Sequence, residues 1–161
     1  METLGRNYFF VKEQKNNKMN VFIVGSPLET AKVLDKKRYN KQCIETKQII
    51  SALFCESKAW SRHPATLQYD EDKLWLQMYH ACLLAYRAGD VAQAQRISEF
   101  ADSIRPSFHT EEFFSQMKRR LYSKDSNHYS QWAYLGTSDE NWYWSPSEQK
   151  IIKYINGKRQ D

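Results

Sequence analysis

The spacing of apolar and polar residues predicts a chain built mainly of helices. Apolar positions recur at helical intervals over about residues 40–56 and again over about residues 71–88. In the second segment apolar residues line two faces: Trp75, Met78, Cys82 and Ala85 on one, and Leu76, Tyr79, Leu83 and Tyr86 on the other. A helix that is apolar on two faces is expected to be the central, buried one.

One capping pattern is expected to open both the first and the last helix. Ser26-Pro27-Leu28-Glu29 places serine at the N-cap, proline at the first helical position and glutamate at the third. The serine side chain can accept a hydrogen bond from a free backbone N–H of the first turn, and the glutamate side chain can accept one from the N–H of the serine. Proline loses no hydrogen bond at the first helical position, because an N–H there has no partner within the helix. Ser145-Pro146-Ser147-Glu148 repeats the pattern, which predicts a last helix that stops at Gly157.

Further signals lie between these two. Asp90 with Gln93 is a capping pattern for a helix running to Ile104, and another helix is expected over residues 110–122. The short apolar run over residues 21–24 fits either a buried strand-like segment or an extended lead-in. Periodicity does not separate these two options.

The predicted fold is all-α: a single compact, irregular helical bundle with an aromatic-rich C-terminal wrap. The chain of 161 residues has the size of one domain. Residues 1–18 look like an N-terminal extension, and residues 19–161 form the expected domain. The wrap holds many large aromatic residues: Tyr129, Trp132, Tyr134, Trp142, Tyr143 and Trp144. They fit either core and lid packing or stacking on unpaired bases.

Charge and cysteine usage narrow the expected setting. The net charge of +5 and a pI near 9.0 favour polyanionic partners such as nucleic acid or an acidic membrane surface. The three cysteines are an odd number without framework spacing, which favours a reducing cytoplasm. No apolar run reaches the length of a membrane span, and no signal peptide precedes the domain. We therefore expect a cytoplasmic protein without a membrane partner.

The stretch from Leu34 to Ile49 is the first candidate site, because it sets one carboxylate beside several cations. The cations can contact phosphates: Lys36, Lys37, Arg38 and Lys41. Glu45 shares a helix face with core-directed residues, and a carboxylate at a dry margin can accept a proton. The alternative is a surface glutamate paired with the lysine four residues before it.

A second basic group, Lys118, Arg119 and Arg120, is expected near the end of the helix over residues 110–122. If both basic groups share one face, the chain has a groove that fits DNA. If they lie on opposite sides, they are solvated helix faces.

The histidines give one further candidate. His63 is fixed before a proline, and it either contacts a phosphate or a flipped nucleotide, or satisfies a backbone carbonyl in a tight turn. His80, His109 and His128 are scattered, without a paired cysteine or histidine at ligand spacing, so no metal is predicted. The chain has no glycine-rich phosphate loop, and no cofactor is expected.

Several short sequence motifs occur along the chain in the order in which a known protein family has them. They are Leu34-Asp35, Lys36, Arg38, Lys41-Gln42, Glu45 and Lys47-Gln48-Ile49; then Trp60 and His63-Pro64-Ala65; then Phe108-His109, Leu121, Lys124-Asp125, His128-Tyr129 and Trp142-Tyr143-Trp144-Ser145-Pro146. From about Met19 to Pro146 the chain resembles the pyrimidine-dimer DNA glycosylase (endonuclease V-type excision) family.

The resemblance implies a compact helical protein that binds and bends damaged double-stranded DNA and forces a nucleotide out of the stack. It implies catalysis by an N-terminal α-amine, which attacks the sugar, forms an imine and leads to strand cleavage by AP lyase chemistry. In this chain the amine would belong to Met19 or Asn20, Glu45 would be the assisting carboxylate, and Arg38 and Lys41 would hold phosphates.

Two departures from the family pattern keep an alternative open. Eighteen residues precede Met19, and the run over residues 116–120 keeps positive charge but lacks the histidine of the family. The alternative is a non-catalytic accessory protein of a phage or mobile element that binds DNA or a host protein through the same fold. If phage-encoded, it would act in the host cytoplasm.

Overall fold

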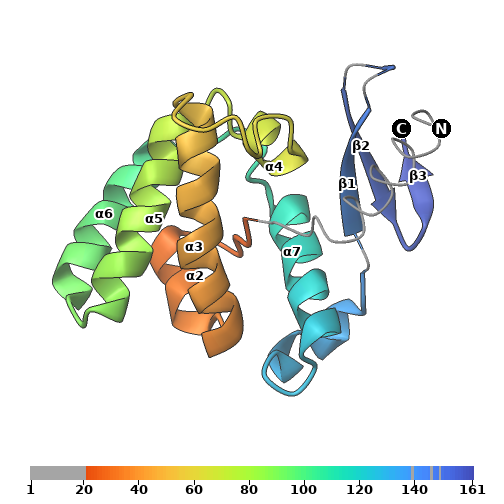
Figure 1. Ribbon diagram of the computed structural model, residues 1–161. Helices are drawn as coiled ribbons and strands as arrows, with labels where there is room; N and C mark the ends of the chain where they lie inside the picture. Colours follow the sequence, from red (N-terminus) through yellow and green to blue (C-terminus); the bar gives the residue numbers. More distant parts are fainter. Residues whose placement is uncertain (1–20, 139, 146, 149) are drawn as a thin grey trace.

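The computed structural model describes residues 21–161 except residues 139, 146 and 149 (Figure 1). The helices are α2 (Pro27–Val33), α3 (Lys36–Leu53), α4 (Pro64–Gln68), α5 (Lys73–Arg87), α6 (Val91–Ser103) and α7 (Glu111–Lys124), followed by the 3₁₀ helix η1 (Ser130–Leu135). Three strands end the chain: β1 (Glu140–Ser145), β2 (Lys150–Ile155) and β3 (Lys158–Gln160). The predicted helical class is confirmed, with a small sheet added to it. The expected extension, residues 1–18, lies outside the described residues.

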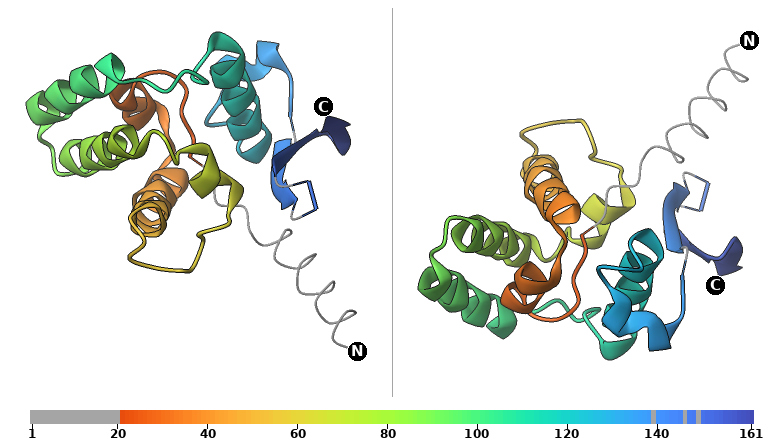
Figure 2. Two further views of the ribbon diagram at one scale, coloured as in Figure 1. Left: turned by 90° about the horizontal axis from the view of Figure 1, so that it is seen from above. Right: turned by 90° about the horizontal axis from the view of Figure 1, so that it is seen from below.

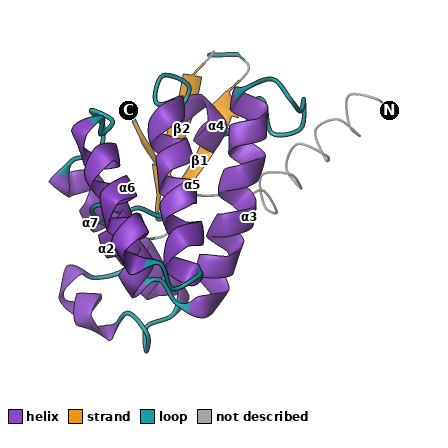
Figure 3. Ribbon diagram, turned by 90° about the vertical axis from the view of Figure 1, so that its left-hand side faces the viewer, coloured by secondary structure: helices purple, strands orange, loops and turns teal. Residues whose placement is uncertain are grey.

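Helix α5 is the centre of the bundle, as its two apolar faces predict. It packs against α2, α3 and α6, and these helices stand side by side in Figure 3. Its buried side chains come from both predicted faces: Trp75, Leu76, Tyr79, Cys82 and Leu83. Helix α7 lies between this bundle and the sheet in both views of Figure 2. The described helices include none long and apolar enough to cross a membrane.

The predicted caps form at three helix starts. At α2 the Ser26 side chain accepts a hydrogen bond from the Glu29 N–H, and the Glu29 side chain accepts one from the Ser26 N–H. Asp90 caps α6 through the Gln93 N–H, and Thr110 caps α7. These local signals therefore fix where α2, α6 and α7 begin.

The predicted last helix is wrong, because the chain forms an antiparallel sheet in the order β1-β2-β3. The Ser145 side chain does accept a hydrogen bond from the Glu148 N–H at 3.2 Å, but it does so in the connection between β1 and β2. Asn156 and Gly157 then form a two-residue turn in which both residues have positive φ, 53° and 78°. Asn-Gly is a strong hairpin signal, and here it decides the structure.

The aromatic-rich wrap is partly folded into the core. Tyr129 and Trp132 are buried around η1, while Tyr134 is exposed. The two buried rings stack at 5.3 Å with their planes 6° apart. Large aromatic residues in this segment therefore anchor η1 against the helices, as the packing alternative predicts.

Candidate functional site

Glu45 lies at the margin of the core on α3. Its side chain is 15% exposed, and its Oε1 lies 3.6 Å from the Lys41 Nζ. Both sequence-based interpretations therefore have a part in the geometry: the carboxylate is largely withdrawn from water, and it is paired with the lysine one turn before it. A carboxylate at the margin of the core is placed where it can contact a reacting group.

The segment that leads into α2 is held next to the same helix. Residues 21–24 are buried and belong to none of the described strands, which favours the lead-in alternative. The Phe22 N–H donates to the Gln42 Oε1 at 3.0 Å, and the Tyr79 hydroxyl lies 3.0 Å from the Phe22 carbonyl oxygen. Tyr79 also donates to the Gln42 Oε1 at 2.9 Å. The backbone at Phe22 is thus fixed by α3 and α5 together.

Helix α7 closes the other side of this segment. The Arg120 guanidinium lies 5.5 Å from the centre of the Phe22 ring, a cation–π arrangement. Arg120 is buried, whereas its neighbours Lys118 and Arg119 are partly exposed. The structure therefore places Arg120 in the interior beside Phe22. Phe22 in turn is bonded to Gln42, which lies three residues before Glu45 on α3.

Arg38 belongs to a second polar cluster at the start of α3. Its Nη1 donates to the Asp35 Oδ2 at 3.2 Å, and the Tyr129 hydroxyl donates to the Asp35 Oδ1. Burial favours a higher pKa for Asp35, but the hydrogen bonds from Tyr129 and Arg38 outweigh it and lower the pKa below its ordinary value. Asp35 is therefore a stable anion that holds one edge of the Arg38 guanidinium.

The two predicted basic groups are joined through this cluster. Tyr129 stacks on Trp132, and the Lys118 Nζ lies 5.8 Å from the centre of the Trp132 ring. The Arg119 Nε donates to the Leu135 carbonyl oxygen at 2.9 Å. The remaining predicted cations of α3 are exposed: Lys36, Lys37 and Lys41. The start of α3 and the end of α7 thus meet at η1, which Figure 1 shows at the lower end of the molecule.

His63 is buried at the start of α4. Its Nδ1 accepts a hydrogen bond from the Ala65 N–H at 3.0 Å, and its ring meets Trp60 edge to face at 5.5 Å. Trp60 has a positive φ of 67°, which is uncommon for a large residue. His63 therefore lies in a tight turn, but the bond of its Nδ1 is to a backbone N–H that it caps and not to the backbone carbonyl of the tight-turn alternative.

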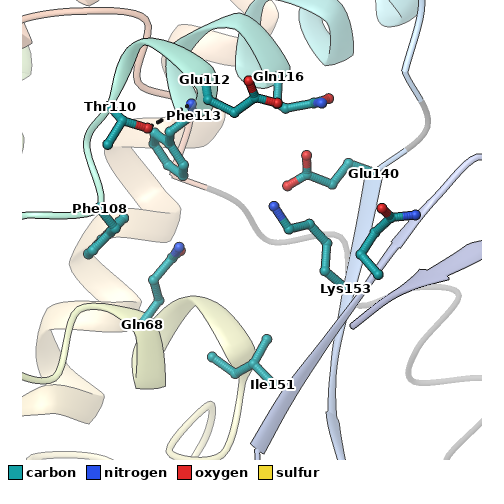
Figure 4. Close-up of a pocket in the computed structure, with 10 residues that line it drawn as sticks. Gln68, Phe108, Thr110, Glu112, Phe113, Gln116, Glu140, Ile151 and Lys153 are labelled. Atoms are coloured by element: carbon teal, nitrogen blue, oxygen red, sulfur yellow. Dashed lines mark hydrogen bonds between the residues drawn. The ribbon is translucent and has the colours of Figure 1, made fainter.

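A cavity of about 420 Å³ opens between α4, α7 and the sheet (Figure 4). Three glutamine side chains line it from three different elements: Gln68, Gln116 and Gln160. Phe108 and Phe113 supply aromatic walls, and Glu140 and Lys153 of the sheet point into the same space. Amide groups beside aromatic faces suit a planar, polar ligand.

The described residues contain no group of histidine, cysteine, aspartate or glutamate side chains arranged to hold a metal ion. The predicted Met19 and Asn20 lie outside the described residues.

A comparison with protein-family models then gives a match to the part of the chain that contains α2, α3, α4 and most of α5. Residues 19–86 match the family described as pyrimidine dimer DNA glycosylase. The resemblance predicted from the sequence is thereby confirmed over this segment. No curated protein and no solved structure matches the chain.

The match to the pyrimidine dimer DNA glycosylases covers most of the candidate site. It begins at Met19 and contains Arg38, Glu45 and His63, and it supports a DNA glycosylase-like, DNA-binding function in general. The second basic group and the cavity residues of α7 and the sheet lie beyond residue 86. For these parts the resemblance stays a prediction.

Sequence reasoning gave no role in the site to four residues that build it: Asp35, Gln42, Tyr79 and Tyr129. A buried glutamine on an apolar helix face was a readable signal, because a buried amide needs partners. The contact between Asp35 and Tyr129 spans 94 residues and leaves no local pattern.

Proposed function

We propose that the protein is a DNA N-glycosylase with AP lyase activity that excises damaged pyrimidines. The amine of a chain that begins at residue 19 or 20 would attack C1′ of the damaged nucleotide. The bond from C1′ to the base would break, and the base would leave with that electron pair and take up a proton. The bond from C1′ to O4′ would then open, O4′ would take up a proton lost by the amine nitrogen, and the imine would form between that nitrogen and C1′. Loss of a proton from C2′ would then expel the 3′ phosphate and cleave the strand.

The observation that carries the proposal is the fixed position of Phe22. Hydrogen bonds to Gln42 and Tyr79 and the Arg120 guanidinium hold it between α3, α5 and α7. Consecutive Cα atoms are 3.8 Å apart, so an amine at residue 19 or 20 stays within roughly 8 Å of the Val21 Cα. Such an amine would therefore belong to the neighbourhood of Glu45 and Arg120.

Glu45 would act as the assisting carboxylate. Its half-buried position limits its hydration, so that it can take the proton of the attacking amine or stabilise the cationic imine. The buried Arg120 would disfavour a second positive charge nearby and so favour the unprotonated, nucleophilic amine.

The cations at the surface would hold the flanking phosphates of double-stranded DNA: the exposed Lys36, Lys37 and Lys41, and the partly exposed Arg38, Lys118 and Arg119. Arginine suits two-pronged phosphate contacts, and lysine acts as a point charge. The buried His63 would support the same surface indirectly, by fixing α4 and Trp60. The cavity lined by Gln68, Gln116 and Gln160 would receive a displaced base.

Glu45→Gln tests the catalytic part of this proposal. In a chain that begins at residue 19, it should lower the rate of cleavage of dimer-containing or abasic duplex by about 100-fold or more, because a positioned acid–base group contributes on that scale. Duplex affinity should be kept, since one negative charge is removed. Glu56→Gln, an exposed glutamate on the loop after α3, is the matched control and should cleave at the original rate. An unchanged rate in Glu45→Gln would refute the assigned role.

A second candidate is a non-catalytic DNA-binding protein of phage or mobile-element origin. The ion pair between Lys41 and Glu45 favours it, because a fully paired carboxylate is also a structural one. This candidate predicts binding of duplex that weakens as salt rises, without cleavage by any form of the chain. If duplex binding is absent too, a host protein becomes the better partner. The buried thiols of Cys43 and Cys82 fit a reducing cytoplasm for either candidate.

A further inference from the structure

Asp35 occupies the N-cap position of α3 without capping it. Its side chain is buried and makes no regular cap hydrogen bond. One carboxylate oxygen instead accepts from the Tyr129 hydroxyl and the other from the Arg38 Nη1 at 3.2 Å. The carboxylate therefore holds two side chains, those of Tyr129 and Arg38, from one position.

Ring packing and hydrogen bonds hold the Tyr129 side chain in place. Its ring is fully buried, lies parallel to Trp132 and meets the edge of the His128 ring at 4.6 Å. Its hydroxyl accepts a hydrogen bond from the Asp35 N–H at 2.9 Å while it donates to the Asp35 carboxylate. The His128 Nε2 lies 2.9 Å from the Val33 carbonyl oxygen, which ties the same segment to the end of α2. The orientation of Asp35 is thus set by residues nearly 100 positions away in the chain.

We propose that Asp35 and Tyr129 are positioning residues that present the Arg38 guanidinium to a DNA phosphate. The inference rests on the proposed DNA-binding function. Arginine carries five N–H donors in a rigid fork, and the bond to Asp35 uses one edge. The other donors are then aimed before DNA arrives, so less side-chain freedom is lost on binding.

For Asp35→Asn, net charge and the positioning role predict opposite changes in the affinity for DNA, so this substitution can test the proposal. Asp35→Asn removes one of the 19 acidic side chains and raises the formal net charge from +5 to +6. Simple attraction to phosphate would then tighten binding. Positioning by Asp35 predicts weaker binding, because the amide holds the guanidinium less firmly than a carboxylate does.

The test is a titration of fluorescein-labelled duplex, carrying an abasic-site analogue, with the full chain at several salt concentrations. Arg38→Ala should weaken binding about tenfold and lower the slope of log K against log salt by about 0.9, the value for one lost phosphate contact. Asp35→Asn and Tyr129→Phe should each produce most of the same two changes. A double variant that combines either substitution with Arg38→Ala should have the same affinity and the same salt slope as Arg38→Ala alone.

Matched controls separate positioning from general effects. Asp70→Asn removes an exposed carboxylate and should bind as tightly as the original chain or slightly tighter. Tyr134→Phe changes an exposed tyrosine of η1 and should have no effect. Arg38→Lys keeps the positive charge but loses the planar guanidinium with its paired N–H donors, and it should also bind the duplex more weakly than the original chain. Because Asp35→Asn and Tyr129→Phe break the same network at different residues, loss of folding in one leaves the other as the test.

The outcomes are distinct. Tighter binding by Asp35→Asn, or additive effects of Tyr129→Phe and Arg38→Ala, would overturn the positioning role while DNA binding stands. A chain that binds no duplex at any salt concentration would overturn this inference and the proposed function together.

Discussion

Gln42 is a buried amide whose oxygen accepts hydrogen bonds from the backbone of Phe22 and from Tyr79. A glutamine is rare in such an apolar place unless its polar atoms are paired. Here the pairing fixes the backbone at Phe22, at the start of the described residues. Gln42 thus links the stability of the molecule to the geometry of its candidate site.

Gln42→Leu should lower the free energy of unfolding by about 2 kcal/mol, because it takes the acceptor from the Phe22 N–H in the interior. Tyr79→Phe, which keeps the ring, should cost about 1 kcal/mol. Urea unfolding at neutral pH measures both values. Gln48→Leu, at an exposed position of the same helix, should change stability by less than about 0.5 kcal/mol. Equal values for Gln42→Leu and Gln48→Leu would contradict the account.

His109 makes the stability of the fold depend on pH. Burial, with a smaller effect of Arg105, lowers the pKa of His109 to about 3, whereas a histidine in an unfolded chain titrates near 6.5. Between these values the unfolded chain binds a proton that the folded protein does not bind. Stability contributed by neutral His109 is therefore complete above about pH 6.5 and is lost as pH falls toward 3, by at most about 1.4 kcal/mol per pH unit.

His109→Phe removes this titration from the cluster of aromatic rings around Trp75 and Phe113. We expect the difference in unfolding free energy between the original chain and the variant to shrink as pH falls from 7 to 4. Urea unfolding at both pH values gives that difference. A difference that does not change with pH would show that His109 does not titrate on unfolding.

Local residue pairs were the most predictable part of the candidate site. The Lys41–Glu45 pair follows from a spacing of four residues on one helix, and the structure contains it. The Asp35–Tyr129 and Phe22–Gln42 contacts join residues 94 and 20 positions apart. Such partners depend on how whole elements pack, so no local pattern could reveal them.

At the scale of elements, caps were predictable and the C-terminal strands were not. The Ser26 pattern opens α2, but the same residue types at Ser145 hydrogen bond within the connection between β1 and β2. The local bond forms in both places, and the packing around it decides which element follows. Asn156-Gly157 was the stronger signal, since its turn requires positive φ at both positions.

Gly157→Ala tests the sheet at that turn. An alanine side chain would meet no atom within 4 Å, so its cost comes from the φ of 78° alone. We expect the free energy that stabilises the sheet to fall by about 1 kcal/mol. Hydrogen exchange measures this change, and the β2 and β3 amides should exchange faster. Gly157→Asn should be milder, because asparagine tolerates this conformation better. Unchanged exchange in Gly157→Ala would contradict the turn as described.

At the scale of the molecule, the candidate site is assembled from both ends of the described chain. The segment matched by the pyrimidine dimer DNA glycosylase family supplies Glu45, Arg38 and the Phe22 lead-in. Helix α7 and η1, outside that segment, supply Arg120, Lys118 and Tyr129. Figure 1 shows α7 standing alongside the bundle, where Arg120 lies against the Phe22 ring and Lys118 against the Trp132 ring. The arrangement joins a largely buried carboxylate and a buried cation to a basic surface.

The central claim is that an amine at residue 19 or 20 reacts with the sugar beside Glu45. Borohydride reduction tests it directly, since it converts an imine between protein and abasic DNA into a stable covalent bond. A chain that begins at Met19 should be trapped on abasic duplex, and the chain that begins at Met1 should not. Trapping of neither chain, or equal trapping of both, would contradict the proposed chemistry.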